Sequence, residues 1–240
     1  MSSLLYKPTS PVSAASSTSP IIAKAPSALC LAAVVRDLGI IDYVEAWQAM
    51  QHFTATRDAE TSDEIWLAQH PPVYTIGRNG RLENSAGYPT TNTIAVVHSD
   101  RGGQVTYHGP GQLIAYVLMD LGRRHWGAKI LVNALEQAAI NLLQDVGIEA
   151  VRQLQAPGVY TAGKKIAAIG LRIRNGCSYH GIALNVAMDL RPFRQIYPCG
   201  QAGLEVTQLS DFAPITMERC QAQFTNLLLR QLGYNAPSNT

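Results

Sequence analysis

A short turn in the C-terminal third holds the residue best suited to covalent chemistry. Cys199 lies in Tyr197-Pro198-Cys199-Gly200, where proline and glycine favour a turn that would present the thiol. A thiolate is a strong nucleophile, but a lone cysteine is more often buried and inert. The turn narrows the choice between a nucleophilic and a structural cysteine without deciding it.

A glycine-rich stretch is the second feature that suggests chemistry. Arg101-Gly102-Gly103 is followed within a few residues by Gly109-Pro110-Gly111. Glycine lets main-chain N–H groups approach a ligand closely, and loops between apolar strands commonly carry binding residues. We therefore favour an anion-binding or oxyanion-stabilising role for this stretch over a plain solvent loop.

The histidines give a weaker signal. His108 and His180 each precede a glycine, which is compatible with a site residue or with a hydrogen-bonded histidine at a turn. The six histidines form no HExxH motif and no i, i+4 pair, and no CxxC pair is present. A metal site is therefore not expected.

The run from Gly158 to Lys165, GVYTAGKK, nearly matches a phosphate-binding P-loop. Its last position is Lys165, where a hydroxyl is required, and the residues that follow are typical of a strand. A P-loop must open a helix whose N-terminus faces the phosphates. We interpret the match as coincidence and expect Ala162-Gly163 to form a turn.

Hydrophobic periodicity predicts the elements that must position these residues. Helices are expected from residue 42, over 130–147 and over 217–233, with Gly147 and Gly233 as stops. Strands are expected at 64–69 and 73–77, joined by a Pro-rich turn, and at 94–98 and 113–121. Three successive strands are expected between 158 and 186, with hairpin turns at Ala162-Gly163 and Asn175-Gly176.

Strands and helices thus occur in blocks, which favours an α+β fold with one mixed or antiparallel sheet and helices on one face. Residues 1–36 are rich in Ser, Pro and Ala and are expected to form a flexible tail. The remainder, 37–240, is expected to be a single catalytic domain, because a chain of 240 residues with 47% hydrophobic residues can build one large core.

Charge and cysteine content exclude several classes of protein. The formal net charge is +2, and the basic excess lies in the tail, so no nucleic-acid partner is expected. No apolar run approaches the roughly 18 to 20 residues that span a bilayer, so no membrane association is expected. Four cysteines without close pairing indicate a reducing compartment, which we take to be the cytoplasm.

Three blocks of sequence together resemble the lipoyl(octanoyl) transferases of the LipB type. They are RGGQVTYHGPGQLIAYVLMDL, GKKIAAIGLRIRNGCSYHGIALNV and PCG, in the family's order, and the resemblance covers roughly residues 38–235. It implies the fold of the lipoate and biotin protein ligases, a mixed sheet flanked by helices. The family's nucleophile matches Cys199, and its activating lysine matches Lys165 and not the preceding Lys164.

The resemblance also implies which residues bind substrate. The segment 101–108 would line the acyl and pantetheine pocket, two further short runs, 168–170 and 181–183, would contact the substrate, and His180 would orient the site. The implied substrate-binding residues are Arg101, Gly102, Gly103, Gln104, Val105, Thr106, Tyr107, His108, Ala168, Ile169, Gly170, Gly181, Ile182 and Ala183.

By resemblance, the enzyme moves an octanoyl group from octanoyl-acyl carrier protein to a specific lysine of a lipoyl domain, through an acyl-thioester on the cysteine and without a cofactor. The implied acceptors are the lipoyl domains of 2-oxoacid dehydrogenase complexes and the glycine-cleavage H protein. The main alternative is an ATP-dependent lipoate or biotin ligase, and a silent carrier-binding module is a third reading. Lys165 together with Pro198-Cys199-Gly200 favours the transferase.

Overall fold

The computed structural model describes residues 32–80, 93–154 and 156–234. Seven strands form one mixed sheet in the order β1-β2-β6-β10-β9-β8-β7. The strands β1 and β2 run parallel, and all other neighbours in this sheet are antiparallel. Their bounds are β1 Val34–Ile40, β2 Glu64–Gln69, β6 Gln112–Leu118, β7 Val151–Arg152, β8 Gly158–Thr161, β9 Lys164–Arg174 and β10 Cys177–Asn185.

A second sheet of three strands has the order β4-β3-β5, with β3 parallel to β4 and antiparallel to β5. These strands are β3 (Val73–Ile76), β4 (Ala95–His98) and β5 (Val105–His108). The predicted strands β2 and β3 are present and joined by the Pro-rich turn, although they lie in different sheets. One expectation was wrong here, because residues 105–108 form a strand inside the stretch that glycine content marked as a loop.

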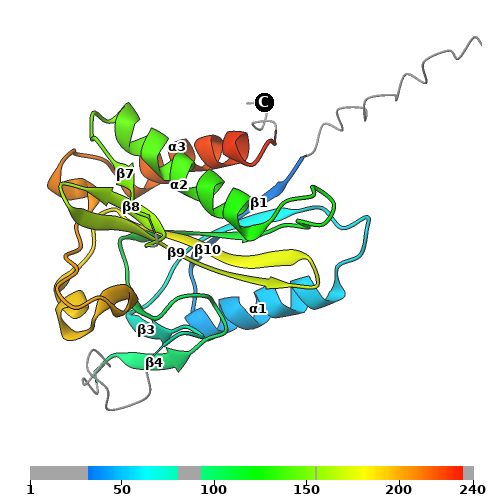
Figure 1. The fold of residues 1–240 in the computed structure, drawn as a ribbon, viewed down its shortest axis with the longest axis horizontal. Coiled ribbons are helices and arrows are strands. Elements are labelled where there is room, and N and C mark those ends of the chain that lie inside the picture. Colours follow the sequence, from blue (N-terminus) through cyan, green and yellow to red (C-terminus); the bar gives the residue numbers. More distant parts are fainter. Residues whose placement is uncertain (1–31, 81–92, 155, 235–240) are drawn as a thin grey trace, which may run out of the picture.

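Helices cover both faces of the large sheet, as Figure 1 shows. The long helices α2 (Ala128–Asp145) and α3 (Met217–Gln231) pack together on one face, and α1 (Tyr43–Thr56) lies on the other. Short 3₁₀ turns, η1 (Arg191–Gln195), η2 (Pro198–Gly200) and η3 (Leu209–Asp211), connect β10 to α3. The α+β class and the mixed sheet flanked by helices are confirmed.

The expectation that helices cover only one face was wrong, and β6 explains why. All seven residues of β6 are buried. Leu113, Ala115 and Val117 belong to the core under α2 and α3, whereas Ile114 and Tyr116 belong to the core under α1. A strand that is apolar on both faces requires cover on both.

The ends of several elements follow from local chemistry. The Asp42 carboxylate accepts from the main-chain N–H groups of Val44 and Glu45, which starts α1. Ala162-Gly163 and Asn175-Gly176 all have positive φ, as two-residue hairpin turns require. The predicted β-meander from β8 to β10 is therefore present.

The first strand was not predicted. Val34, Val35 and Arg36 of β1 pair with Glu64, Ile65 and Trp66 of β2, so the ordered fold begins before the predicted domain start at 37. Most of β1 is exposed, and its sequence therefore lacks the alternation that identifies a half-buried strand. Residues 1–31 of the predicted tail lie outside the described residues.

Candidate active site

The side chains of Lys165 and Cys199 meet near the start of β9, although they are 34 positions apart in sequence. Lys165 Nζ lies 3.1 Å from Cys199 Sγ and donates to the Pro157 carbonyl oxygen at 3.1 Å. The ammonium also lies 5.1 Å from the centre of the Tyr160 ring. Only 3% of Lys165 is exposed, so the amine meets the thiol in a largely desolvated position.

The main chain also holds these two residues together. The Lys165 N–H donates to the Glu205 carbonyl oxygen at 2.9 Å, and the Thr207 N–H donates to the Lys165 carbonyl oxygen at 3.0 Å. Residues 205–207, a few positions after Cys199, thus pair with β9 as a short parallel bridge. The segment that follows the cysteine is anchored directly to the lysine.

A β-bulge lies at the same place in β9. Val159 pairs with Ala167 but Tyr160 pairs with Lys165, which leaves Ile166 as an extra residue on β9. Ile166 and Ala167 both belong to the core under α2. Regular alternation would place Ile166 on the face opposite Ala167, and the bulge breaks that alternation at this point.

Cys199 has a left-handed backbone. Its φ is 55° and its ψ is 20°, and the next residue, Gly200, has a φ of 73°. The Gly200 N–H donates to the Tyr197 carbonyl oxygen at 2.7 Å, which closes the turn, and a Cβ on Gly200 would overlap the Gln104 side chain. A non-glycine residue in this conformation is strained by about 1 to 3 kcal/mol. Such strain is often found at functional sites, where a side chain must be held in one direction.

Electrostatics favour a charged amine beside the thiol. Burial by itself lowers the pKa of Lys165, but the negative charge of a Cys199 thiolate and the contact with Tyr160 outweigh burial, and the net pKa of Lys165 is raised. Lys165 is therefore an ammonium at neutral pH. Such an ammonium stabilises a thiolate at hydrogen-bond distance.

A loop anchored on α2 covers Lys165. The buried Glu136 carboxylate accepts from the Gly158 N–H at 2.9 Å and pairs with Arg152 at 3.0 Å. Gly158 has a φ of 134°, and a Cβ there would lie 3.2 Å from Lys165 Cε and 2.5 Å from the Ala167 carbonyl oxygen. The absence of a side chain at Gly158 leaves the space that the lysine occupies.

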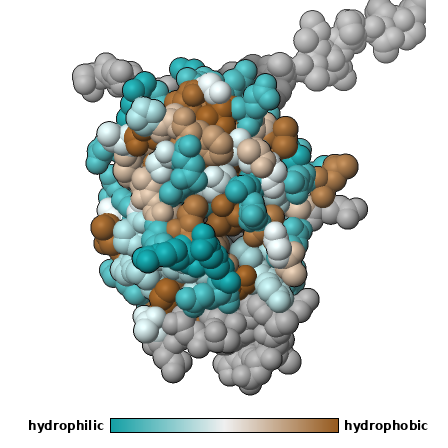
Figure 2. All heavy atoms as spheres, turned by 90° about the vertical axis from the view of Figure 1, so that its left-hand side faces the viewer, coloured by the Kyte–Doolittle hydropathy of each residue, from teal (hydrophilic) through white to brown (hydrophobic). Residues whose placement is uncertain are grey.

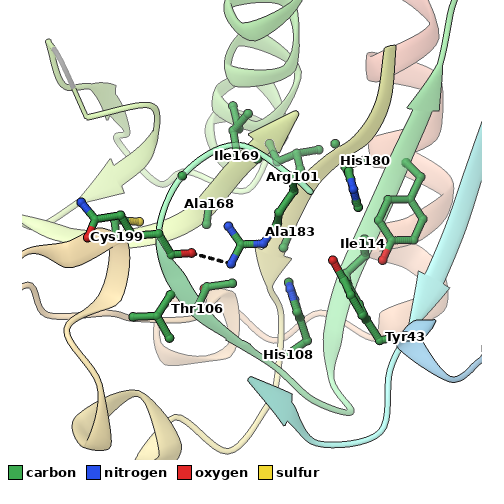
Figure 3. Close-up of a pocket in the computed structure, with 17 residues that line it drawn as sticks. Tyr43, Arg101, Thr106, His108, Ile114, Ala168, Ile169, His180, Ala183 and Cys199 are labelled. Carbon is green, nitrogen blue, oxygen red and sulfur yellow. Dashed lines mark hydrogen bonds between the residues drawn. The ribbon is translucent and has the colours of Figure 1, made fainter. Parts of the chain in front are cut away.

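An apolar cavity runs from Cys199 into the interior and is drawn in Figure 3. The space between its lining atoms, together with the open mouth, is about 500 Å³. Most of the predicted binding residues line it, from β5, β9, β10 and the loop before β5. They are Arg101, Gly103, Gln104, Val105, Thr106, His108, Ala168, Ile169, Gly170, His180, Gly181, Ile182 and Ala183.

Two predicted binding residues lie elsewhere. Tyr107 belongs to the core between the small sheet and η1, because strand alternation turns it away from Thr106 and His108. Gly102 lines a second hollow and is pressed against β9, where its N–H donates to the Leu171 carbonyl oxygen at 2.8 Å.

Three lining residues were missed by the sequence analysis: Tyr43, Ile114 and Tyr116. They lie on α1 and β6, and in sequence they are indistinguishable from ordinary core residues. Only the topology, which brings β5 and β6 together with the start of α1, identifies them as lining residues.

Cys199 also borders the second hollow, which contains Lys165. Five residues line both spaces: Gly103, Gln104, Ile169, Gly170 and Cys199. The second hollow is also lined by Asn79, Gly102, Val132, Ala156, Pro157, Lys165, Leu171 and Gln201. The thiol is thus reached from two sides. One side is the apolar interior, and the other contains the ammonium.

Arg101 is a buried guanidinium in the cavity wall. It donates to Thr75 Oγ1 and to the carbonyl oxygens of Thr75, Gly102 and Gln104, at 2.6 to 2.9 Å, and Figure 3 draws the bond to Gln104. Burial lowers its pKa from a very high ordinary value. These bonds fix the glycine-rich loop beside Cys199.

The two histidines of the cavity are neutral, because burial lowers the pKa of His180 and lowers that of His108 further. His180 Nε2 lies 2.9 Å from Asp100 Oδ1, and His108 Nδ1 lies 2.7 Å from Gln112 Oε1. Asp100 also accepts from Trp47 at 2.7 Å, and was not singled out from sequence. These contacts orient the rings, and neither histidine has a contact with Cys199.

Other classes of site find no support in the described parts of the chain. No group of three or more His, Cys, Asp and Glu side chains there is arranged to hold a metal ion. The P-loop-like run forms the β8–β9 hairpin and starts no helix. Among the same residues, no helix is both long and apolar enough to cross a membrane.

Comparison with known proteins gives a family match over most of the chain. The model of the lipoyl protein ligase A/B catalytic domain matches residues 42–229. The chain is 56% identical over 201 residues to an octanoyltransferase of Stutzerimonas stutzeri, covering 83% of this chain and 90% of that one. It is 54% identical over 203 residues to an octanoyltransferase of Dechloromonas aromatica, covering 83% and 96%.

Solved structures share the fold at low sequence identity. The putative lipoate protein ligase Ta0514 from T. acidophilum aligns with a TM-score of 0.70 at 16% identity, covering 87% of this chain and 88% of that one. A lipoate-protein ligase A bound with ATP aligns with a TM-score of 0.66 at 15% identity, covering 88% of each chain.

Proposed function

Because the chain belongs to the lipoyl protein ligase A/B catalytic-domain family and is an acyltransferase of octanoyl groups, we propose that it takes octanoyl from acyl carrier protein. In this proposal Cys199 carries the acyl group as a thioester and delivers it to one lysine of a lipoyl domain. The contact of 3.1 Å between Lys165 Nζ and Cys199 Sγ carries the proposal.

In the first half-reaction, the Cys199 thiolate attacks the thioester carbonyl of octanoyl-phosphopantetheine. A new C–S bond forms to Cys199, the C–S bond to pantetheine breaks, and the Lys165 ammonium gives its proton to the departing thiolate. One thioester replaces another. The step is therefore nearly isoenergetic and needs no nucleotide.

In the second half-reaction, the amine of the acceptor lysine attacks the acyl-enzyme. The C–N bond of the amide forms, the C–S bond to Cys199 breaks, and the now neutral Lys165 takes the proton from the attacking nitrogen. The thiolate charge that raises the pKa of Lys165 is absent from the acyl-enzyme, whereas burial of the amine, which lowers that pKa, remains. Lys165 is therefore better able to be neutral, and to accept this proton, at this stage.

The two spaces beside Cys199 suit the two parts of the substrate. The octanoyl chain would occupy the apolar cavity, and the pantetheine arm and the acceptor lysine would enter through the second hollow. Gly103 and Gln104 line both spaces, and their main-chain N–H groups donate to no other described residue. They are our choice for stabilising the oxyanion.

The proposed acceptors are lipoyl domains of 2-oxoacid dehydrogenase complexes and the H protein. A basic cluster of Arg123, Arg124 and Lys129 is a poor docking surface for the carrier protein, because Arg124 is largely buried beside Tyr234 and Arg123 pairs with Asp120. Asp120 forms a β-bridge with Cys177 at the start of β10, and this part of β10 is remote from Lys165. This cluster therefore does not border the thiol.

The face in Figure 2 carries hydrophobic and hydrophilic side chains side by side.

We place the enzyme in a reducing compartment, the cytoplasm, because the thiol must stay free. Cys177, Cys199 and Cys220 are all unpaired in the described chain.

Intact-protein mass spectrometry tests the proposal. Incubation with octanoyl-acyl carrier protein, without ATP, should add the mass of one octanoyl group at Cys199, and later addition of a lipoyl domain should move that mass to the domain. Transfer that requires free octanoate and ATP would instead establish the ligase reaction and overturn the proposal.

A further inference from the structure

The cavity beside Cys199 has a buried far end made of aromatic rings. Tyr43 and Cys199 lie on opposite sides of the cavity in Figure 3. Tyr43 is 2% exposed, Tyr116 is 3% exposed and His108 is 6% exposed, whereas Cys199 is only half-buried. The cavity therefore opens at the thiol and ends against these rings.

The Tyr43 ring is held in place on several sides. It stacks on the His108 ring, with centres 5.7 Å apart and an angle of 11° between the planes, and meets the His70 ring edge-on at 5.3 Å. Its hydroxyl donates to Ser99 Oγ at 2.7 Å. A ring fixed by stacking and by a buried hydrogen bond is a rigid stop for a flexible chain.

The length of the cavity can be judged from β5, which runs along it. Gln104, just before β5, touches the Cys199 turn through Gly200, and His108 at the other end of β5 stacks on Tyr43. From Val105 to His108 is about 10 Å at roughly 3.3 Å per residue. An octanoyl chain of seven carbon–carbon bonds is about 9 Å long when extended.

We propose that the phenol ring of Tyr43 sets the length of the acyl chain by closing the cavity beyond the eighth carbon. The inference rests on the proposed octanoyl thioester at Cys199. Among these rings, Tyr43 is the one whose substitution should disturb the fold least, because it lies in the first turn of α1. Tyr116, by contrast, is a central residue of β6, and His108 holds the buried Gln112 side chain.

Competition between donors tests this role. The full-length enzyme is offered equal amounts of octanoyl-, decanoyl- and dodecanoyl-acyl carrier protein, and the adducts on Cys199 are resolved by intact mass. We expect the wild type to favour octanoyl over dodecanoyl by at least about tenfold, as discrimination by a closed apolar pocket allows. Tyr43→Ala should lower this preference by a similar factor.

Two further variants make the result specific. Tyr43→Phe keeps the ring and removes only the hydroxyl, with its contacts to Ser99 and Arg101, so its preference should remain that of the wild type. Tyr43→Leu also shortens the side chain but fills more of the core than alanine does. It replaces Tyr43→Ala as the shortened variant if circular dichroism shows that Tyr43→Ala does not fold. A shift in Tyr43→Phe as large as that in Tyr43→Leu would overturn the role of the ring.

The failures of the two proposals differ in outcome. A normal octanoyl adduct on the wild type, with an unchanged chain-length preference in Tyr43→Leu, would overturn this inference alone. The lack of any adduct on wild-type Cys199 would overturn the thioester route and this inference together.

Discussion

Lys164 and Lys165 are adjacent in sequence, yet their ammonium groups have different partners. Lys165 Nζ lies 3.1 Å from Cys199 Sγ and is buried, whereas Lys164 Nζ pairs with Glu205 Oε2 at 3.0 Å and 44% of its side chain is exposed. The two residues form a natural pair of test and control positions.

Lys165→Ala should slow both octanoyl transfer and alkylation of Cys199 by iodoacetamide at pH 7, because no other ammonium among the described residues contacts the thiol. We expect transfer to fall by at least about a thousandfold, as when a nucleophile loses its activator. Lys164→Ala removes an exposed ion pair worth about 0 to 1 kcal/mol and should leave both rates near wild type. Equal alkylation rates in the two variants would contradict the role of Lys165.

Cys199→Ser should fold like the wild type and lose octanoyl transfer by at least about a thousandfold, because a serine hydroxyl is a far weaker nucleophile than a thiolate. Thermal unfolding followed by circular dichroism checks the fold, and a discontinuous transfer assay checks activity. Cys177→Ser is the control, since that thiol lies at the start of β10 outside both cavities. Transfer that survives in Cys199→Ser would exclude the covalent route.

Gly158→Ala should impair both stability and activity. The added Cβ would lie 2.5 Å from the Ala167 carbonyl oxygen and 3.4 Å from Lys165 Nζ, in a backbone conformation that favours glycine. We expect a lower melting temperature and slower alkylation of Cys199. Gly163→Ala is the matched control, because its φ is also positive but no atom lies within 4 Å of its Cβ. Identical alkylation rates in both variants would show that Gly158 does not position the lysine.

Stability should fall as pH decreases from 7.5 to 5.5. Burial lowers the folded-state pKa of His70, His108 and His180, so below about pH 6.5 the unfolded chain binds more protons than the folded one. The contribution of these neutral histidines to the free energy of unfolding is therefore fully present above the pKa of the unfolded chain. It is lost on acidification, by up to about 1.4 kcal/mol per pH unit for each histidine. Urea unfolding at several pH values measures this slope.

His70→Gln should reduce that slope by up to about 1.4 kcal/mol per pH unit, the contribution of one proton. A slope that is the same in the wild type and in His70→Gln would show that His70 does not contribute.

Local sequence patterns were sufficient for much of the fold. The Asp42 cap, the glycine stops of α2 and α3 and the two hairpin turns each act within a few residues, and the structure has all of them. What failed depends on distant partners. The strand β1 is defined by pairing with β2, and β5 by pairing with β3, while neither has a clear pattern of its own.

The same division holds for the site. The resemblance selected Lys165 and Cys199, and their distance of 3.1 Å is a result of topology that no local pattern contains. Tyr43 could not be selected from the sequence, because an apolar residue at the start of a helix predicts packing in the core as well as it predicts lining of a cavity. Asp100 was missed because a carboxylate in a loop has no pattern that distinguishes it from a solvated one.

The pairing of residues 205–207 with Lys165 uses only peptide groups. Peptide hydrogen bonds are the same for every residue type except proline, and the Glu205 side chain is exposed, so a substitution at position 205 leaves the main-chain link to Lys165 intact. Position 205 is thus a suitable place to attach a label next to the reactive centre.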